Sequence, residues 1–391
     1  MEYKRLKIVY SSDSYFPIID GVAVVIKNYT EQLKNTNDIA LVIPRIPHQN
    51  ITPDGYQIIK LRAWNWLWFT GDYPYVLPWN HRFAKKLDAF KPDIIHIHTP
   101  FNAGKLLMRY AKKHHIPVVL TMHTKFDSDL LRTTKSKIIT KIFLWKLKQV
   151  IKNVDRIYFP NEHTLLYNRS IFKIPNLTGK IIPNCTEMVP LQNEQSAIDE
   201  VNARFHIHPN TLVFTCCFRI VWNKNLKFYV ALFKEFIKYN VDFVFIVIGD
   251  GAQADWFRDN LAFLGKHVIF TGKITDRIFL QKIFLRANLS IFPSEYDCAS
   301  LTVVENACNK TPILAIKDTG TAGEIIDNVN GFLCENDPIA FAKRIKTIID
   351  QPQLLQKVSE AAFKTIYKTW SDVCKMLIVD YNDVIEHYAP N

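Results

Sequence analysis

The sequence predicts an α/β protein built from two doubly wound domains, each with a parallel sheet. Short apolar runs alternate with helical patterns along the chain, which is the order of elements expected for a parallel sheet covered by helices. The alternation pauses around residues 181–190 and then starts again. With 391 residues, of which 48% are apolar and 22% charged, the chain suits two globular cores better than one.

The apolar runs give the positions of the expected strands. In the first block they cover residues 6–10, 39–43, 94–97, 117–120 and 156–159, and in the second block 212–217, 243–248, 268–271, 289–292 and 312–315. We place the domain boundary between residues 187 and 188. Parallel strands put ligand crevices at their carboxyl ends, so two such domains predict a central cleft that both domains face.

Three strand-end loops of the first block carry candidate functional residues. Gly21 permits close backbone approach just before a helix expected to begin near Val22. His98 and His123 each follow a strand, where an imidazole can bond a sugar hydroxyl or a phosphate. A glycine in an ordinary turn is the alternative for Gly21. The histidine spacing matches no local metal motif.

An aromatic segment lies between the second and third expected strands of this block. Trp64, Trp66 and Trp68 alternate along the chain, and aromatic faces of this kind can stack on sugar rings or sit at a membrane interface. A strand that packs its aromatic side into the core is the competing interpretation, and we keep acceptor binding as the secondary one.

Positive charge is concentrated in the first half of the chain. Residues 1–185 carry 28 Lys and Arg against 13 Asp and Glu, a net +15, whereas residues 186–391 carry 21 against 24, a net −3. Between Lys105 and Lys152 there are twelve basic residues and only two acids, Asp127 and Asp129. Such a surface attracts anionic lipid headgroups, an anionic glycan or nucleic acid.

Within this basic stretch, the residues from Lys135 to Lys152 predict an amphipathic helix. Lysines recur at 137, 141, 148 and 152, and the other face is formed by apolar residues at 139, 142, 143, 147, 150 and 151. A surface helix with a solvated charged side is the usual meaning of this pattern. Peripheral contact with an anionic membrane is the alternative, because the excess of lysine is one-sided.

The rest of the composition narrows the setting. The seven cysteines are scattered and never spaced C-x-x-C, which favours reduced thiols and a cytoplasmic location. The N-terminal apolar run is too short for a signal peptide, and no apolar stretch approaches the roughly eighteen residues of a membrane span.

The loop after the first strand of the second block carries two cations, Arg219 and Lys224. Five positions apart and placed between a strand and a helix, they can reach one diphosphate, Arg as a bidentate fork and Lys as a point charge. An ordinary basic loop is the alternative. The next two strand-end loops contain Gly249, then Lys273 and Ile274, and are weak nucleotide-binding candidates by themselves.

The most informative segment covers residues 292–307, with the sequence Phe-Pro-Ser-Glu-Tyr-Asp-Cys-Ala-Ser-Leu-Thr-Val-Val-Glu-Asn-Ala. A strand is expected to end at Phe292 and a helix to begin near Ser300, so free backbone N–H groups point back to the turn and suit a phosphate. Asp297 and Glu305 can hold hydroxyls on either side by charge-assisted hydrogen bonds. A capped helix with two solvated acids is the alternative.

These segments together resemble the retaining glycosyltransferases of family 4, which have the GT-B fold. Asp297 and Glu305 match the family's acid-x7-acid signature, with Asp in place of the usual first Glu. Phe218 and Lys310 stand where the family commonly has glycine. Asp127-Ser-Asp129 has the form of the Asp-x-Asp metal motif of the other large fold, GT-A, but it opens a helical stretch, and no metal site is predicted.

The resemblance implies an activity and a division of labour between the domains. The chain would be a retaining, metal-independent hexosyltransferase that takes glucose or mannose from a donor such as UDP-glucose or GDP-mannose. Its acceptor would be a hydroxyl of a glycan or of a lipid-linked molecule. Residues 1–187 would bind the acceptor, completed by a last helix over residues 371–391, and residues 188–370 would bind the nucleotide sugar.

The resemblance also implies roles for single residues. Glu305 would hold the ribose, Asp297 the sugar hydroxyls, and Arg219 and Lys224 the diphosphate. Further donor contacts would come from Gly21, His123, Gly249, Lys273, Ile274 and the backbone of Ser300, Leu301 and Thr302. His98 and the tryptophans at 64, 66 and 68 are acceptor candidates.

Three other functions fit the same residues. A sugar-nucleotide 2-epimerase shares the fold and needs no acceptor. A DNA-modifying glucosyltransferase fits a basic protein, although we disfavour nucleic acid as a partner. A non-catalytic carbohydrate- or membrane-binding descendant is the third, and the retention of both acids and both cations argues against it.

Overall fold

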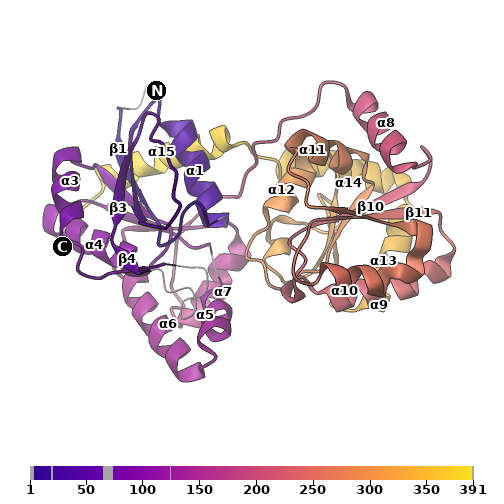
Figure 1. The fold of residues 1–391 in the computed structure, drawn as a ribbon, viewed down its shortest axis with the longest axis horizontal. Coiled ribbons are helices and arrows are strands. Elements are labelled where there is room, and N and C mark those ends of the chain that lie inside the picture. Colours follow the sequence, from indigo (N-terminus) through magenta and orange to yellow (C-terminus); the bar gives the residue numbers. More distant parts are fainter. Residues whose placement is uncertain (1–3, 19–20, 65–73, 124, 390–391) are drawn as a thin grey trace. The chain divides into compact units, whose positions relative to one another are not determined.

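The computed structural model describes residues 4–18, 21–64, 74–123 and 125–389, which form two compact α/β units (Figure 1). One unit comprises Met1–Pro183 with Trp370–Asn391, and the other comprises Asn184–Thr369. Each unit contains one large parallel sheet, which confirms the predicted fold class. The predicted boundary at residues 187 and 188 lies within the first residues of the second unit.

The first unit is organised around seven parallel strands in the order β3-β2-β1-β6-β7-β8-β9. Their bounds are β1 Lys7–Ser11, β2 Asp38–Pro44, β3 Gln57–Leu61, β6 Ile94–Ile97, β7 Val118–Thr121, β8 Arg156–Phe159 and β9 Lys180–Ile181. The chain adds strands on one side of β1 and then on the other, so the order reverses between β1 and β6. Such reversals place loop ends apart and create binding crevices at the strands' carboxyl ends.

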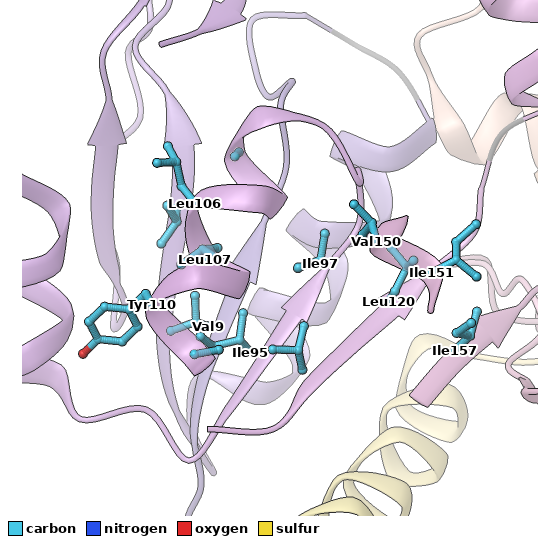
Figure 2. Packing of buried hydrophobic residues seen from close by; sticks show 14 of the residues in the cluster. Val9, Ile95, Ile97, Leu106, Leu107, Tyr110, Leu120, Val150, Ile151 and Ile157 are labelled. Carbon is cyan, nitrogen blue, oxygen red and sulfur yellow. The ribbon is translucent and has the colours of Figure 1, made fainter. Parts of the chain in front are cut away.

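Helices cover this sheet and supply its core. They are α1 Gly21–Leu33, α3 Arg82–Phe90, α4 Asn102–His114, α5 Phe126–Thr134, α6 Lys137–Ile151, α7 Glu162–Phe172 and α15 Trp370–Glu386. Figure 2 shows how side chains of α4, among them Leu107, pack over the strands that carry Val9 and Ile95. The central strands β6 and β7 are buried on both faces and are mostly apolar.

The second unit has a six-stranded parallel sheet in the order β12-β11-β10-β13-β14-β15. Its strands are β10 Leu212–Cys217, β11 Phe243–Ile248, β12 Val268–Gly272, β13 Leu289–Phe292, β14 Ile313–Ile316 and β15 Phe332–Cys334. Its helices are α8 Glu194–Phe205, α9 Leu226–Phe236, α10 Ala254–Leu261, α11 Arg277–Arg286, α12 Leu301–Cys308, α13 Pro338–Ile349 and α14 Pro352–Thr365.

Aromatic rings dominate the core of the second unit. Phe233 on α9 lies 4.4 Å, between ring centroids, from Phe245 on β11, and 5.8 Å from Phe243 on the same strand. All three side chains are at most 2% exposed. Tilted and stacked ring contacts of this kind add to the stability gained from burial alone, so α9 is fixed firmly against the centre of the sheet.

The last helix, α15, returns to the first unit and buries polar groups in it. Tyr158 on β8 donates a 2.7 Å hydrogen bond to Asp380, whose side chain is only 2% exposed. Lys180 forms an ion pair with the same carboxylate, and Arg156 lies 2.7 Å from Asp383 on the next turn. A buried carboxylate needs such partners, and the basic sheet edge provides them.

Several strands were absent from the sequence predictions. β3, with five residues, lies at one edge of the first sheet, β9 with two residues at the other, and β15 with three residues at an edge of the second sheet. The antiparallel pair β4 Ala63–Trp64 and β5 Tyr75–Val76 is also short. Segments of two or three residues carry no periodicity, so pattern reading has nothing to detect.

Among the described residues, no helix combines the length and the apolar character needed to span a bilayer.

Two glycines in the second unit allow neighbouring strand-end loops to approach backbone to backbone. A Cβ at Gly249, whose φ is +134°, would lie 1.9 Å from the carbonyl oxygen of Phe218. A Cβ at Gly251 would lie 2.2 Å from the carbonyl oxygen of Ile220. The Ile220 N–H in turn donates to the Asp250 carbonyl at 2.9 Å. The loop that contains Arg219 is thus fixed against the loop after β11.

We predict that Gly249→Ala destabilises the second unit by more than about 2 kcal/mol, because the new methyl group meets backbone and the φ angle is strained. Gly272→Ala is the matched control. It also has a positive φ, +69°, but its Cβ would have open space, so it should cost only about 1 kcal/mol. Urea unfolding followed by circular dichroism checks both, and equal losses would contradict the steric explanation.

Candidate functional site

The loop between β13 and α12 forms the centre of the candidate site in the second unit. Ser300 is the N-cap of α12, as the sequence predicted to within a residue. The amide of Asn184 donates to the Ala299 carbonyl at 3.1 Å, and the amide of Asn225 donates to the Pro293 carbonyl at 3.1 Å. A Cβ at Gly320 would lie 2.2 Å from the Asp297 carbonyl oxygen. The loop is therefore held from three sides.

The helix that follows this loop offers backbone donors. Leu301 and Thr302 occupy the first turn of α12, where N–H groups have no partner within the helix. The Ser300 side chain makes no capping hydrogen bond to them. The positive end of the helix dipole adds to these donors, so the arrangement suits an anion such as a phosphate.

Asp297 and Lys224, both predicted site residues, form an ion pair. The Lys224 Nζ lies 2.6 and 2.8 Å from the two carboxylate oxygens of Asp297. Ser294 donates a further hydrogen bond of 2.6 Å to the same carboxylate. The two charged side chains are only 16% and 19% exposed. Fold topology explains the meeting, because β10 and β13 are neighbours in the sheet and both loops leave its carboxyl edge.

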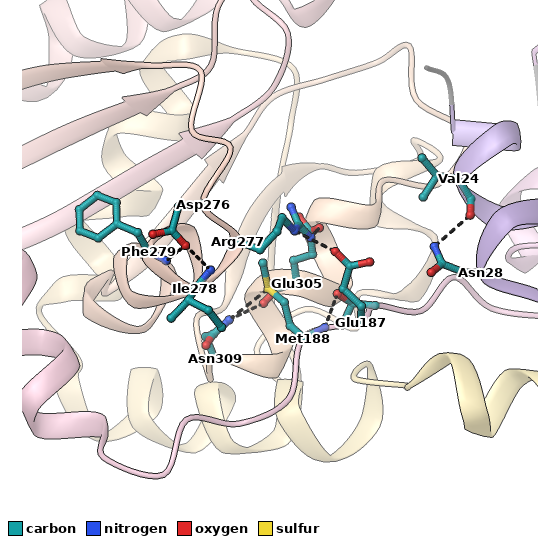
Figure 3. A network of polar contacts seen from close by, with 11 residues as sticks. Val24, Asn28, Glu187, Met188, Asp276, Arg277, Ile278, Phe279, Glu305 and Asn309 are labelled. Carbon is teal, nitrogen blue, oxygen red and sulfur yellow. Dashed lines mark hydrogen bonds and ion pairs between the residues drawn. The ribbon is translucent and has the colours of Figure 1, made fainter. Parts of the chain in front are cut away.

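Glu305, on α12, is held by a residue that the sequence analysis missed. Figure 3 shows Arg277 between two carboxylates: its Nη2 lies 2.5 Å from Glu305 Oε1, and its Nε lies 3.0 Å from Glu187 Oε1. The Glu305 side chain is only 11% exposed. Arg277 begins α11, three residues after Ile274, so its only sequence signal was its place behind a strand-end loop.

A cysteine adjoins this pair. Cys217 ends β10, and the Thr302 hydroxyl donates to its carbonyl at 3.4 Å. Burial, together with the nearby Glu305 carboxylate, raises the pKa of the Cys217 thiol to about 12, with Arg277 opposing the shift. The thiol stays protonated at neutral pH and is not a nucleophile here.

The remaining predicted residues of the second unit lie in loops at the carboxyl ends of its strands. Hydrogen bonds between their side chains do not connect them with one another. Arg219 is exposed, and within the described part of the chain it forms no hydrogen bond or ion pair. Lys273 is likewise exposed, and Ile274 packs partly against the core. Gly249 has the close backbone contact described above.

In the first unit, His98 and His123 meet directly. His98 Nδ1 lies 2.9 Å from His123 Nε2, and the two ring planes are nearly parallel, with centroids 5.2 Å apart. His96 stacks on His98 with 4.1 Å between the ring centroids. Adjacent strands explain the arrangement, because His96 lies in β6 and His98 follows it, while His123 follows β7. His98 is 1% exposed and therefore lies beneath His123 instead of reaching solvent.

The histidine stack is neutral. Burial lowers the pKa of His123 from 6.5 to about 4. Burial and the neighbouring imidazoles lower the pKa of His98 well below its ordinary value, and the same holds for His96. His96 is fixed at both ring nitrogens, by the Tyr381 hydroxyl and the Thr121 hydroxyl, each at 2.6 Å. In the 2.9 Å contact, one neutral ring donates and the other accepts.

The other described site residues predicted in the first unit, Gly21 and Trp64, form no hydrogen bond with these histidines. Gly21 is the first residue of α1, exposed, with open space around the position of a Cβ. Trp64 in β4 is 55% exposed, so its ring is not packed into the core. Trp66 and Trp68 lie outside the described residues.

The described residues contain no cluster of three or more His, Cys, Asp or Glu side chains that could hold a metal ion. Asp127, from the Asp-x-Asp pattern, accepts hydrogen bonds from the Tyr167 hydroxyl and from the Ser128 N–H. It lies in the first turn of α5, where carboxylates are common.

Comparisons with known proteins place both halves of the chain in one family. The family model described as Glycosyl transferases group 1 matches residues 198–365, and that described as Glycosyltransferase Family 4 matches residues 19–188. The two models together span both units.

Several characterised proteins are similar over most of their length. Alpha-monoglucosyldiacylglycerol synthase from Acholeplasma laidlawii is 25% identical over 97% of this chain and 98% of its own. A GDP-mannose-dependent alpha-(1-6)-phosphatidylinositol dimannoside mannosyltransferase from Mycobacterium tuberculosis is 20% identical over 89% of each chain.

Solved structures share the fold. A glycosyltransferase from Rickettsia africae superposes with a TM-score of 0.72 at 14% identity, over 98% of this chain and all of the other. Anabaena HepE in complex with UDP and glucose superposes with a TM-score of 0.69 at 14% identity, over 97% of this chain and 100% of the other.

We predict that His96, His98 and His123 titrate far below ordinary histidines, His123 near pH 4. Between about pH 6.5 and pH 4 the unfolded chain then binds more protons than the native state, so the free energy of unfolding falls as the pH falls through this window. NMR titration of the ring Cε1–H signals checks the prediction, with His123→Gln to assign its resonance. Midpoints near 6.5 for all three rings would contradict it.

Proposed function

The chain belongs to family 4 of the retaining glycosyltransferases, the glycosyl transferases group 1, and from this premise we propose that it transfers a glucose- or mannose-type hexose from a UDP- or GDP-sugar to a hydroxyl of a lipid-linked acceptor. Family membership makes it a hexosyltransferase with a nucleotide-sugar donor. The observation that carries the donor site is the convergence of two carboxylates, their two cations and the N-terminus of α12 at one edge of the second sheet.

The diphosphate of the donor would lie against the first turn of α12. Its charge is met there by backbone N–H groups, by Lys224 and by the exposed Arg219. Lys224 is paired with Asp297 in this structure. We infer that the ammonium group turns toward the phosphates when the donor binds, which frees Asp297 oxygens to accept hydrogen bonds from the hexose hydroxyls.

The nucleoside would be held by Glu305 through its ribose hydroxyls. Arg277 occupies Oε1 of that carboxylate, and the other oxygen is available to accept from a ribose hydroxyl. An arginine in this place fixes the orientation of the carboxylate without blocking it. Arg277 is therefore a positioning residue, itself steadied by Glu187. Gly249, Lys273 and Ile274 would line the same loops.

Roles in the first unit follow the family resemblance. His123 would accept or donate a hydrogen bond at a hydroxyl of the transferred hexose, as a neutral imidazole whose ring is fixed by His98. Gly21 would let the backbone at the start of α1 come close to the diphosphate. Of the described acceptor candidates, His98 is buried, whereas the exposed ring of Trp64 can stack on an apolar or sugar surface.

The reaction would retain the anomeric configuration by displacement on one face of the sugar. The bond from the anomeric carbon to the phosphate oxygen breaks, and the acceptor oxygen forms the new bond on the same face. The acceptor proton passes to the leaving phosphate. Lys224, Arg219 and the N–H groups of α12 offset the charge that develops on that phosphate, and we propose that no metal is required.

A lipid acceptor is supported by the relatives. Both characterised proteins named above are named for products or substrates that are lipids, and each aligns with 89% or more of this chain. The excess of positive charge in the first half, +15 over residues 1–185, suits an anionic bilayer surface. We accordingly place the protein in the cytoplasm, peripherally at a membrane through the region from Lys135 to Lys152, and we rank a DNA acceptor below a lipid.

We predict transfer of labelled hexose from UDP-glucose or GDP-mannose into the organic phase when the protein is supplied with vesicles that contain diacylglycerol. Thin-layer chromatography of the extract, with and without EDTA, measures it. The rate should be unchanged by EDTA, because side-chain cations and backbone N–H groups supply the charge compensation. Label that enters only water-soluble glycans would refute the lipid acceptor, and dependence on a divalent metal would refute the charge argument.

We further predict that Arg277→Gln weakens binding of UDP or GDP roughly tenfold, because Glu305 loses the partner that orients it. Binding of the matching 2′,3′-dideoxynucleotide, which lacks the ribose hydroxyls, should change far less. Calorimetric titration gives both constants. Arg344→Gln is the matched control, since it also removes an arginine that pairs with a carboxylate in this unit, Asp327 at 2.7 Å. Equal losses for the two nucleotides would refute the positioning role.

A further inference from the structure

The N-terminal half of α6 exposes large apolar side chains. Ile138 is 73% exposed, Trp145 61% and Ile142 49%. The three positions are spaced i, i+4 and i+7, which places them on one face of the helix. Single exposed apolar residues are normal on a protein surface, but a contiguous row on one helix face indicates a surface that binds something.

This row is separate from the face that α6 packs into the core. Leu147, Val150 and Ile151 are at most 4% exposed and belong to the main cluster of the first unit, and Val150 and Ile151 are visible in Figure 2. The sequence analysis assigned one apolar face to this helix. The structure divides those residues, because Leu147, Val150 and Ile151 are buried whereas Ile139, Ile142 and Phe143 are exposed.

Other apolar side chains of α5 and α6 are less exposed than this row. Ile139 and Phe143 on α6 are 43% and 37% exposed, and Leu131 on α5 is 41% exposed. Figure 1 shows α5 and α6 side by side, and the two helices are in contact. We call the row on α6 the α6 patch; its members are Ile138, Ile142 and Trp145.

The charged residues of α6 itself are all lysines. Lys135, Lys137, Lys141 and Lys146 are exposed and come from the same stretch of chain. No Asp or Glu occurs between Asp129 and Asp155. Lys137 and Lys141 form no ion pair among the described residues, so their charge is available to a partner. The patch therefore combines an apolar centre with an uncompensated cationic rim.

We propose that the α6 patch inserts into the interface of an anionic bilayer, with Ile138, Ile142 and Trp145 at the level of the acyl chains and the lysines on lipid phosphates. Apolar side chains with lysines beside them are the signature of a helix that lies in the membrane surface, and tryptophan favours that interface. A second copy of this chain is the poorer occupant, because a symmetric contact would bring the lysine rims together.

The inference rests on the proposed function for its meaning, since a bilayer that holds the acceptor is then the surface on which the enzyme works. It extends that function from adsorption by charge to insertion by apolar side chains. The two modes differ in their response to salt. Charge attraction between exposed groups is screened at about 0.5 M salt, where the Debye length is only a few Å, whereas apolar insertion persists.

Vesicle flotation of the full chain tests the inference. The vesicles are phosphatidylcholine alone or phosphatidylcholine mixed with phosphatidylglycerol, at low salt and at about 0.5 M salt. We expect binding to the anionic vesicles, with a measurable fraction retained at high salt. The double variant Ile138→Gln, Trp145→Gln should bind roughly tenfold more weakly or worse, and its residual binding should vanish at high salt.

The matched control is the double variant Ile326→Gln, Ile339→Gln, which changes two apolar side chains of similar exposure, 61% and 62%, in the second unit. It should bind vesicles like the wild type. Brominated lipid gives a second readout, because bromine on the acyl chain should quench wild-type fluorescence more than that of Trp145→Phe. Calorimetric binding of UDP or GDP verifies that each variant is folded.

The experiments distinguish a failure of the membrane-insertion proposal from a failure of the proposed function. The inference is overturned if the patch variant binds vesicles like the wild type, if all wild-type binding disappears at high salt, or if the patch proves to mediate a dimer in sedimentation velocity. Transfer to detergent-dispersed lipid should be the same in wild type and patch variant. If vesicles bind but no lipid accepts hexose, the insertion stands and the proposed acceptor is wrong.

Discussion

Two carboxylates at the carboxyl ends of the second sheet's strands are largely shielded from solvent, and each is paired with a cation. An ionised group with little solvent access is costly unless it is paired. Asp297 has Lys224 and Glu305 has Arg277. Much of the local fold serves these pairs: β10 lies next to β13, so the loops after them meet, and glycine at 249 lets the Arg219 loop pack closely enough. In our proposal, the donor phosphates would take the place of Asp297 as the partner of Lys224. The ribose would share the Glu305 carboxylate with Arg277.

The first unit solves a related problem with neutral groups. Its strand ends carry imidazoles where the second unit carries charges, and burial keeps those rings unprotonated at neutral pH. The tautomer and orientation of His123 depend on His98, and His96 beneath them depends on Tyr381 of α15. A neutral ring can bond a hydroxyl either as donor or as acceptor. The two units thus contribute different chemistry through the same kind of strand-end loop.

Sequence reading located the elements that carry strong periodicity or capping signals. The central strands and the N-cap at Ser300 have such signals, whereas the return of the last helix and the roles of the acidic and basic motif residues were implied by the family resemblance. Arg277 was missed because its contact with Glu305 joins two elements that no local pattern connects. The exposure of Ile138 and Trp145 was also beyond reach, since helical spacing identifies a face but does not say whether another element covers it. Edge strands of two or three residues have no period to detect.

The path of the chain has a consequence for how the molecule is assembled. The first unit is begun by the earliest residues and finished by Trp370–Asn391, after the whole of Asn184–Thr369 has been made. During synthesis, Tyr158 and His96 therefore leave the ribosome long before Asp380 and Tyr381, their hydrogen-bond partners, exist. No single cut can release this unit intact. A circular permutation that placed α15 ahead of β1 would make the first unit contiguous in sequence. That unit would then be synthesised completely before the second unit begins.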